Sequence, residues 1–404
     1  MPKGLNHIDI ELLDKFRNKF SESFQLPLNT NKSYDALSVM VFEKTHVRIS
    51  KSTLRRLFQY NSAYLPTKSS LDIVAKSIGY LGWDNFVEIE RTVCQYDLSQ
   101  MIMSFQLGGF PEHTDIPQLF VQYKNNPLLF NLLEILVNKA ISNKDINFLS
   151  NIFNLPNLFT PKQDALKIYF FIHNLVYRLN ESGLMSQLIE TYGENKNAQV
   201  HMVEWYVDED HLDGYYYDLL QVYHQHKQNS EALLFYYCLM YQHEIKSNRD
   251  TSKWLDLIKS VQITDEIHPI PRARMWGSLL LETNNIETEQ GVMTGVKTFI
   301  ESLNEDDKII CGLKIARLLF IKRKPFTILQ ILKLIPEHNG FGKNIWTRIN
   351  INQLKIYRAY ALFEDGNTVK AKEEMEKFNK ILVNNFIREC ILVDFHTIHN
   401  LIYA

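Results

Sequence analysis

The segment that decides the fold reads Ile49-Ser-Lys-Ser-Thr-Leu-Arg-Arg-Leu-Phe-Gln-Tyr60. Its apolar side chains recur at helical spacing, with Leu54 and Leu57 on one face, so that face is expected to be buried. Ser50 is a typical N-cap, because its hydroxyl can accept a hydrogen bond from the backbone N–H of Thr53. The pattern predicts a short helix that begins directly after Ser50.

The opposite face of this predicted helix is polar and basic. It carries Lys51, Ser52, Arg55 and Arg56. A short helix with one buried stripe and a cationic outer face fits the major groove of DNA in both size and charge. We therefore predict that these four side chains, together with Ser50, contact double-stranded DNA.

The charge of the surrounding segment supports this interpretation. Between residues 44 and 76, seven basic residues stand against one acid, Asp72, so the segment has a net charge of +6. The whole chain has a net charge of −2, which leaves −8 for the remainder. A basic patch on an otherwise acidic protein is typical of a local contact with phosphate. The predicted contact therefore also includes Lys44, Arg48 and Lys68.

The residues on either side of the segment complete a recognisable pattern. An apolar helix is predicted over residues 34–45, and a further helix over 69–78 is closed by Gly79, the first residue of the tail Gly79-Tyr-Leu-Gly-Trp-Asp-Asn-Phe86. Over residues 34–86 the chain resembles the helix-turn-helix domains of the lambda repressor and Cro class. One departure lies in the turn, where that class usually has a glycine and this chain has Thr45-His46-Val47. The resemblance implies a small all-α domain that binds DNA.

The rest of the chain is predicted to form one helix after another. Breaks rich in Gly, Pro and Asn recur at intervals of about one helix, and the alternation typical of strands is scarce. The clearest break is Gly108-Gly-Phe-Pro111. We therefore place a helix-turn-helix domain at residues 1–97 and a second domain at residues 98–404, which is either an α-solenoid or a large helical bundle.

The segment at residues 354–378 favours the solenoid. It resembles a tetratricopeptide repeat, with Ala359 and Ala371 at the small positions, Gly366 at the turn and Phe378 at the end. Small residues are needed at such positions because the two helices of a repeat cross closely. The predicted fold class is therefore all-α, with a small helix-turn-helix domain followed by an α-solenoid of tetratricopeptide-like helical hairpins.

An aromatic-rich stretch lies in the middle of the second predicted domain. Tyrosine offers a large contact area with a polar end, which suits a groove that binds a peptide. The alternative is that these aromatic residues fill the cores of the helical hairpins. We predict that some of them bind a peptide or protein ligand, namely Trp205, Tyr206, Tyr216 and Tyr223.

Side chains that can bind metal also gather in this stretch, at His201, Glu204, residues 208–211 and residues 224–226. A His and a Glu three positions apart would share one face of a helix. However, no His-Glu-x-x-His motif occurs, and thirteen histidines make chance proximity common. Gly-x-Ser-x-Gly is absent, and Gly340-Phe-Gly-Lys343 lacks the spacing of a phosphate-binding loop. We predict no metal, no cofactor and no catalytic residue.

The composition sets the remaining limits. With 404 residues, 45% hydrophobic and 22% charged, the chain is expected to form two or three globular domains. It has no apolar run long enough to span a membrane, and its first residues lack an apolar signal core. We therefore expect a cytoplasmic protein without a membrane partner, and the resemblance to helix-turn-helix regulators implies a bacterial one. The four cysteines are far apart and are expected to be reduced and mostly buried, at Cys94, Cys238, Cys311 and Cys390.

The combined pattern predicts a homodimeric, DNA-binding transcriptional regulator whose second, helical repeat domain senses a peptide or protein signal, forms the dimer, or does both. A signal in the second domain would change the spacing of two DNA-binding heads. This layout resembles the peptide-sensing regulators that join a Cro-type domain to helical repeats. Two alternatives stay open. One is a non-enzymatic interaction scaffold whose helix-turn-helix binds protein, and the other is an enzyme whose site no motif reveals.

Overall fold

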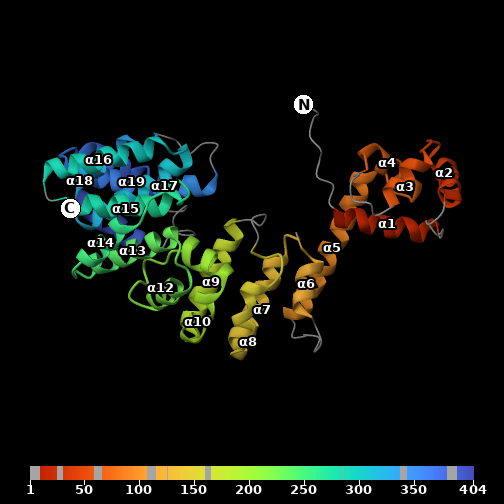
Figure 1. Cartoon of the computed structure of the whole chain (residues 1–404), viewed down its shortest axis with the longest axis horizontal. Helices are drawn as coiled ribbons and strands as arrows, with labels where there is room; N and C mark the ends of the chain where they lie inside the picture. Colours follow the sequence, from red (N-terminus) through yellow and green to blue (C-terminus); the bar gives the residue numbers. More distant parts are fainter. Residues whose placement is uncertain are drawn as a thin grey trace. The chain divides into compact units, whose positions relative to one another are not determined.

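The chain is all-α in its computed structural model (Figure 1). The described residues are 10–24, 31–58, 66–106, 115–124, 126–159, 165–283, 285–336, 344–379 and 389–404. Every regular element within these ranges is a helix, which confirms the predicted fold class at this level. None of the helices in these ranges is both long enough and apolar enough to cross a bilayer.

Contacts within the chain divide it into two compact units. The N-terminal unit comprises residues 1–136 and 156–158, and the C-terminal unit comprises residues 137–155 and 159–404. The division falls within helix α7, Leu129–Asn143. Helix α5, Trp83–Gln106, continues through residues 97 and 98. The predicted break at residues 108–111 lies outside the described residues, and the domain boundary near residue 97 stays a prediction.

The first five helices of the N-terminal unit share one hydrophobic core. Aromatic side chains from α1 and α5 form its centre, where the Phe16 ring lies edge-on to Trp83 and to Phe86 at centroid distances of 5.2 and 4.9 Å. Asp115 caps α6 by accepting from the backbone N–H of Gln118. The helices before α7 are α1 Ile10–Phe24, α2 Asn31–Thr45, α3 Lys51–Phe58, α4 Lys68–Ser77, α5 and α6 Ile116–Gln122.

The turn between α2 and α3 is closed without a glycine. His46 has a φ of 57°, in the left-handed region that usually favours glycine, and its N–H donates to the carbonyl of Phe42 at 2.8 Å. The Ser38 hydroxyl donates to the carbonyl of Ile49 at 2.6 Å and holds the far end of the turn against α2. His46 therefore closes the turn in a left-handed conformation, which glycine adopts more readily than other residues.

The C-terminal unit is a longer series of helices. Many of them begin at an Asn or Asp cap, as α13 does at Asn229, whose side chain accepts from the backbone N–H of Ala232. After α7, the helices are α8 Ile146–Asn151, η1 Ile152–Asn154, α9 Ala165–Glu181, α10 Met185–Glu194, α11 Lys196–Ala198, η2 Gln199–Trp205, α12 Tyr215–His226, α13 Ser230–Lys246, α14 Ser252–Ser260, α15 Pro269–Leu281, α16 Ile286–Glu301, α17 Glu305–Ile321, α18 Pro325–Lys333, α19 Ile345–Glu364, α20 Thr368–Glu376 and α22 Glu389–Tyr403.

Alternate helices of this unit pack side by side. Helix α15 packs between α13 and α17, and α17 packs in turn against α19. Each of these helices also packs against the helix that follows it. In the pair α19 and α20, Ala359 and Ala371 are fully buried and Gly366 has a φ of 82°. The structure thus confirms the two buried small residues and the glycine turn that the sequence predicts for this helix pair.

Two cysteines are free thiols in the core of the C-terminal unit. Cys238 and Cys311 are both buried. Burial raises the pKa of Cys238 to about 12, so its thiol stays protonated and unreactive near neutral pH. This agrees with the predicted reduced and buried state. The side chains of Cys94 and Cys390 lie outside what the structure describes.

Candidate functional site

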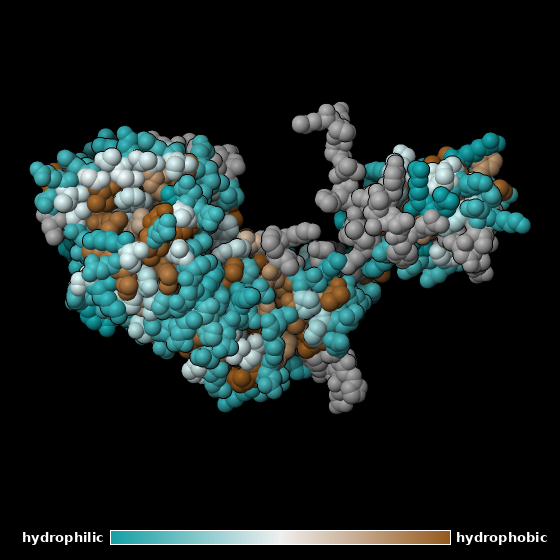
Figure 2. All heavy atoms as spheres, viewed as in Figure 1, coloured by the Kyte–Doolittle hydropathy of each residue, from teal (hydrophilic) through white to brown (hydrophobic). Residues whose placement is uncertain are grey.

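Helix α3 has one buried face and one basic face. Leu54 and Leu57 are fully buried in the core of the N-terminal unit. The exposed residues of the helix are Lys51, Ser52, Arg55 and Arg56. The structure therefore confirms the predicted division of the helix into two faces. Figure 2 shows a largely hydrophilic surface over α2 and α3 where these helices are visible.

Ser50 fixes the start of this helix. Its hydroxyl oxygen accepts from the backbone N–H of Thr53 at 3.1 Å, as predicted, and lies 2.8 Å from the hydroxyl of Ser52. The Ser50 side chain thus provides an acceptor for a backbone N–H in the first turn of α3 that has no partner within the helix. This bond makes Ser50 a residue that positions α3.

Two further cationic side chains that are predicted to contact DNA lie over aromatic rings. The ammonium of Lys44, at the end of α2, is 4.5 Å from the ring centre of Phe24. The guanidinium of Arg48, in the turn, is 5.6 Å from the ring centre of Phe42. Both cationic side chains are exposed. Such contacts hold a charge near the surface without neutralising it.

The remaining contacts of the basic surface are exposed ion pairs. Lys51 lies 3.2 Å from a carboxylate oxygen of Asp35, and both side chains are more than half exposed, at 59% and 56%. Lys68, at the start of α4, lies 2.6 Å from Asp84. Exposed pairs of this kind are weak and are screened by salt. These lysines can therefore exchange their carboxylate for a phosphate at small cost.

The one acid of the basic segment is used inside the domain. Asp72 accepts from the backbone N–H of Trp83 at 2.8 Å and so ties α4 to the first residue of α5. The negative charge of Asp72 therefore lies at the N-terminus of α5, where the helix dipole makes a negative charge favourable. The exposed part of the segment keeps its cationic character.

The second candidate site is a pocket of about 490 Å³ within the C-terminal unit. One wall comes from α9, η2, α12 and α13, and the other from α15, α17, α19 and α22. Pockets of this size hold ligands in the range of small molecules and short peptides. Its residues are Ala165, Ile168, Tyr169, His201, Glu204, Trp205, Tyr206, Val207, Tyr223, Glu231, Phe235, His268, Ile270, Pro271, Arg274, Ile310, Leu313, Lys314, Arg317, Trp346, Ile349, Asn350, Gln353 and Ile391.

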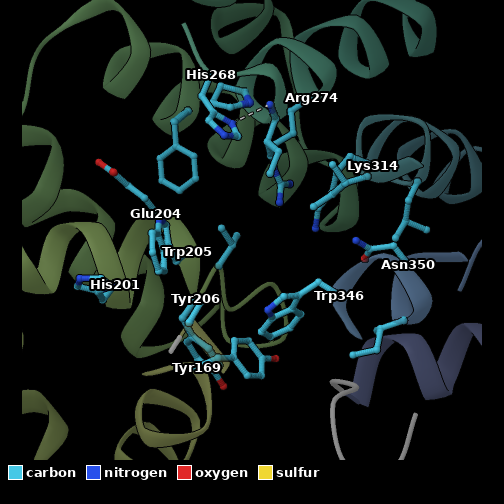
Figure 3. A pocket seen from close by; sticks show the side chains of 18 of the residues that line it. Tyr169, His201, Glu204, Trp205, Tyr206, His268, Arg274, Lys314, Trp346 and Asn350 are labelled. Carbon is cyan, nitrogen blue, oxygen red and sulfur yellow. Dashed lines mark hydrogen bonds between the residues drawn. The ribbon is translucent and has the colours of Figure 1, made fainter. Parts of the chain in front are cut away.

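Aromatic side chains join the two walls of this pocket. The rings of Tyr169 on α9 and Trp346 on α19 meet edge to face at 4.8 Å (Figure 3). Tyr169 also lies 5.6 Å from Tyr206, whose hydroxyl is 3.0 Å from Nδ1 of His173. The pocket therefore has a broad aromatic side that can bury an apolar group of a ligand.

Three of the four predicted ligand-binding residues line the pocket. Trp205 is 56% exposed at the end of η2, a π-helix, and Tyr206 and Tyr223 also contribute to the lining. Irregular π-turns of this kind are frequent at functional sites. Tyr216 lies elsewhere, because it is fully buried and its hydroxyl donates to the carbonyl of Val203 at 2.6 Å.

A buried carboxylate lies beside the pocket with three cations around it. Glu209 is 2.7 Å from Arg274, 2.6 Å from Arg317 and 3.8 Å from Lys314. The amide of Gln242 donates to the same carboxylate at 2.9 Å. Burial alone would raise the pKa of Glu209, but Arg317, Arg274 and Lys314 together hold the pKa well below its ordinary value. Glu209 is therefore ionised.

A second acid stands at the edge of this cluster. Asp394 on α22 lies 3.9 Å from Nε of Arg317 and accepts from the hydroxyl of Tyr357 at 2.7 Å. Burial raises the pKa of Asp394, despite Arg317 and the tyrosine bond, which act in the opposite direction. Asp394 is therefore a weaker counter-ion for the cations than Glu209.

No local sequence pattern marks the residues of this cluster. Glu209 stands in a run of potential metal ligands in the sequence, whereas the structure places it in an ion-pair network. Within the described residues, a group with metal-ligand atoms close together occurs at the exposed residues Glu190, Glu194 and His226. Arg274, Lys314 and Trp346 carry no local motif, since they come together only through the packing of α15, α17 and α19.

No family model matches this sequence, and no curated protein or solved structure shows significant similarity to it.

Proposed function

We propose that the protein is a DNA-binding transcriptional regulator. In this proposal, α2 and α3 form a helix-turn-helix, and α3 enters the major groove. The C-terminal unit is a solenoid of tetratricopeptide-like hairpins that receives a peptide or protein signal. The protein is not an enzyme and acts in the bacterial cytoplasm.

One observation carries the proposal for DNA binding. Helix α3 is short, is held by two buried leucines, and turns four exposed polar side chains outward, with Arg55 and Arg56 among them. Arginine is the side chain that most often reads guanine in the major groove. The exposed cations Lys44, Arg48 and Lys68 stand near both ends of this helix in sequence, where they suit the phosphates on either side of a groove.

The test removes the two arginines from the full chain. Binding sites are first selected from a random pool of duplex DNA with the wild-type protein. The double variant Arg55→Ala, Arg56→Ala should lose specific binding to the selected sites, because each arginine that contacts a base contributes about 1–3 kcal/mol. Its helical circular dichroism should match that of the wild type, since both side chains are exposed.

A matched control removes two exposed lysines from the C-terminal unit. The double variant Lys297→Ala, Lys370→Ala carries the same change in net charge and should bind the selected sites like the wild type. Full affinity in the folded Arg55→Ala, Arg56→Ala variant would refute the role of α3. It would also favour the alternative in which this unit binds protein.

We further propose that the homodimer is built through α5. Apolar side chains recur on this helix in the spacing of a heptad, and they are exposed by 40–64% at Ile89, Val93, Tyr96 and Met103. A stripe with this spacing pairs with an identical stripe from a second helix. A second copy of the chain is the partner that this pattern fits, because recognition helices act in pairs on two half-sites of DNA.

The dimer is tested by sedimentation of the full chain. The double variant Val93→Glu, Tyr96→Glu places like charges in the proposed seam and should sediment as a monomer, whereas the wild type should sediment as a dimer. Both positions are at least half exposed, so the fold should tolerate the change. A wild-type monomer, or an unchanged dimer in the variant, would contradict the proposed seam.

A further inference from the structure

Helix α19 contributes two side-chain amides to the pocket of the C-terminal unit. Trp346, Asn350 and Gln353 follow one another at steps of four and three residues, so they share one face of the helix, and all three line the cavity. Figure 3 shows the side chains of Trp346 and Asn350 directed toward the cavity. This face of α19 therefore offers one aromatic ring and two amides to a ligand.

Neither amide has a hydrogen-bond partner within the part of the chain that the structure describes. Gln353 is only 8% exposed, and Asn350 is half-buried. A side-chain amide carries an NH₂ donor and a carbonyl acceptor, and such groups are costly to bury without partners. Because both amides line the cavity, a ligand that offers donors and acceptors would remove this cost.

The residue before Gln353 shows how an amide of this helix holds a main chain. Nδ2 of Asn352 donates to the carbonyl of Asn379 at 3.0 Å, and its Oδ1 accepts from the backbone N–H of the same residue at 2.9 Å. Every peptide residue except proline offers this pair of groups. The amide of Asn352 is therefore satisfied by a main chain, whereas the amides of Asn350 and Gln353 face the pocket.

The spacing of the two amides fits an extended peptide. Asn350 and Gln353 are three positions apart on the helix, which places their Cβ atoms about 5–6 Å apart. In an extended peptide, every second residue turns its N–H and C=O to the same edge, at a repeat of about 7 Å. Two such residues are therefore within reach of the two side chains.

The charged side chains of the pocket are held within the protein. Its three basic side chains all pair with Glu209, and Glu204 pairs with Lys227. Glu231 stands in the first turn of α13, where the helix dipole favours a negative charge. A charged group on a ligand would compete with these interactions, whereas the aromatic side of the pocket offers apolar surface to an uncharged one.

We propose that this pocket binds a short, uncharged segment of peptide by its main chain. Asn350 and Gln353 bond alternate residues along one edge of the extended segment, and the aromatic side of the pocket buries an apolar side chain that projects from it. This inference rests on the proposed sensing role of the C-terminal unit and specifies which chemical groups of the signal are recognised.

The test begins with capped tetrapeptides on the immobilised full-length protein. Each peptide is acetylated at its N-terminus and amidated at its C-terminus, so that its ends carry no charge, and the library has charged and uncharged side chains at every position. We expect retention of the uncharged peptides, with enrichment of an apolar or aromatic residue at one position. Mass spectrometry of the eluted peptides identifies them.

Ester replacements then show whether the main chain is recognised. In each version of a retained peptide, one backbone N–H is replaced by an oxygen atom, which removes a donor without adding bulk. Removal of a donor that bonds a buried amide should weaken retention about tenfold. The loss should occur at two positions that are two residues apart, and the position between them should tolerate the replacement.

Side-chain variants connect retention to the pocket. Gln353→Met keeps the size of the side chain and removes the amide, so retention should weaken about tenfold and become insensitive to one of the two ester replacements. Its urea midpoint should not fall, because no described residue loses a hydrogen bond. Gln290→Met, the same change at an exposed position of α16, should leave retention unchanged. Asn350→Leu, at a half-buried position, decides the matter if Gln353→Met does not fold.

Three results would overturn the inference: retention of no capped peptide, preference for charged side chains, and equal retention of all ester versions. Unchanged retention by the folded Gln353→Met and Asn350→Leu variants would also do so. Binding of the same preparation to duplex DNA is measured in parallel. Lost peptide retention with intact DNA binding would refute this inference and leave the DNA-binding part of the proposed function in place. Selective peptide retention without DNA binding would do the reverse.

Discussion

The two units use cations in opposite ways. In the N-terminal unit, the basic side chains of α3 are exposed, and the ion pair of Lys51 with Asp35 stands in solvent. In the C-terminal unit, Arg274 and Arg317 are almost entirely buried and share the carboxylate of Glu209. The first arrangement leaves charge available for a partner, while the second makes charge part of the core.

This difference separates binding from stability. An exposed pair contributes about 0–1 kcal/mol to folding, so α3 can lose cations and still fold. A buried pair that loses one partner leaves an uncompensated charge inside the protein. Substitutions around α3 should therefore change DNA binding, whereas substitutions in the Glu209 network should change the free energy of unfolding.

Glu209→Gln should destabilise the C-terminal unit most. It leaves Arg274 and Arg317 buried without their carboxylate, which costs about 3–5 kcal/mol. The measurement is the urea midpoint followed by tryptophan fluorescence. Glu301→Gln serves as the control, since Glu301 is 59% exposed and pairs with Lys297 at 3.8 Å. Equal losses in the two variants would mean that burial of the Glu209 network does not matter for stability.

The same carboxylate should make the protein sensitive to acid. The cations hold the pKa of Glu209 well below its ordinary value of 4.5, so its stabilisation is complete above about pH 4.5. As the pH falls below that value, the unfolded chain takes up the proton first and the stabilisation is lost. The difference in urea midpoint between wild type and Glu209→Gln should therefore shrink in acid. A constant difference across this range would contradict the depressed pKa.

The contrast also explains what the sequence could predict. The N-cap at Ser50 and the two faces of α3 depend on residues a few positions apart, so local patterns identified them. The ion-pair network depends on Glu209, Arg274 and Arg317, which are far apart in the sequence and meet only through packing. No periodicity marks such a set. Aromatic enrichment selected Trp205 and Tyr223, which line the pocket, but it also selected the core residue Tyr216.

Ala371→Leu should have an intermediate effect. Ala371 is fully buried on α20, which packs closely against α19, so extra carbon atoms would overpack the contact and cost about 1–3 kcal/mol. Ala371→Ser should be mild by comparison, because it adds one atom whose hydroxyl can bond the preceding turn. Thermal melting of both variants gives the answer. An unchanged midpoint for the leucine variant would remove the support for a tetratricopeptide-like hairpin here.

Asp35→Asn should have the smallest effect on stability. It breaks the exposed pair with Lys51, which is worth less than about 1 kcal/mol. It also removes a negative charge beside α3, so retention on duplex DNA should increase at low salt. The urea midpoint and a filter-binding titration measure the two effects. Weaker retention would show that the surface around Lys51 does not face DNA.

The central claim is that the exposed cations of α2 to α4 meet DNA phosphates. Its most direct test is the affinity of the full wild-type chain for random duplex DNA as a function of salt concentration. Neutralising about four phosphates should lower the affinity roughly a hundredfold between about 50 mM and about 200 mM salt, along a straight line in logarithmic coordinates. No retention at about 50 mM, or retention that does not change with salt, would contradict the account.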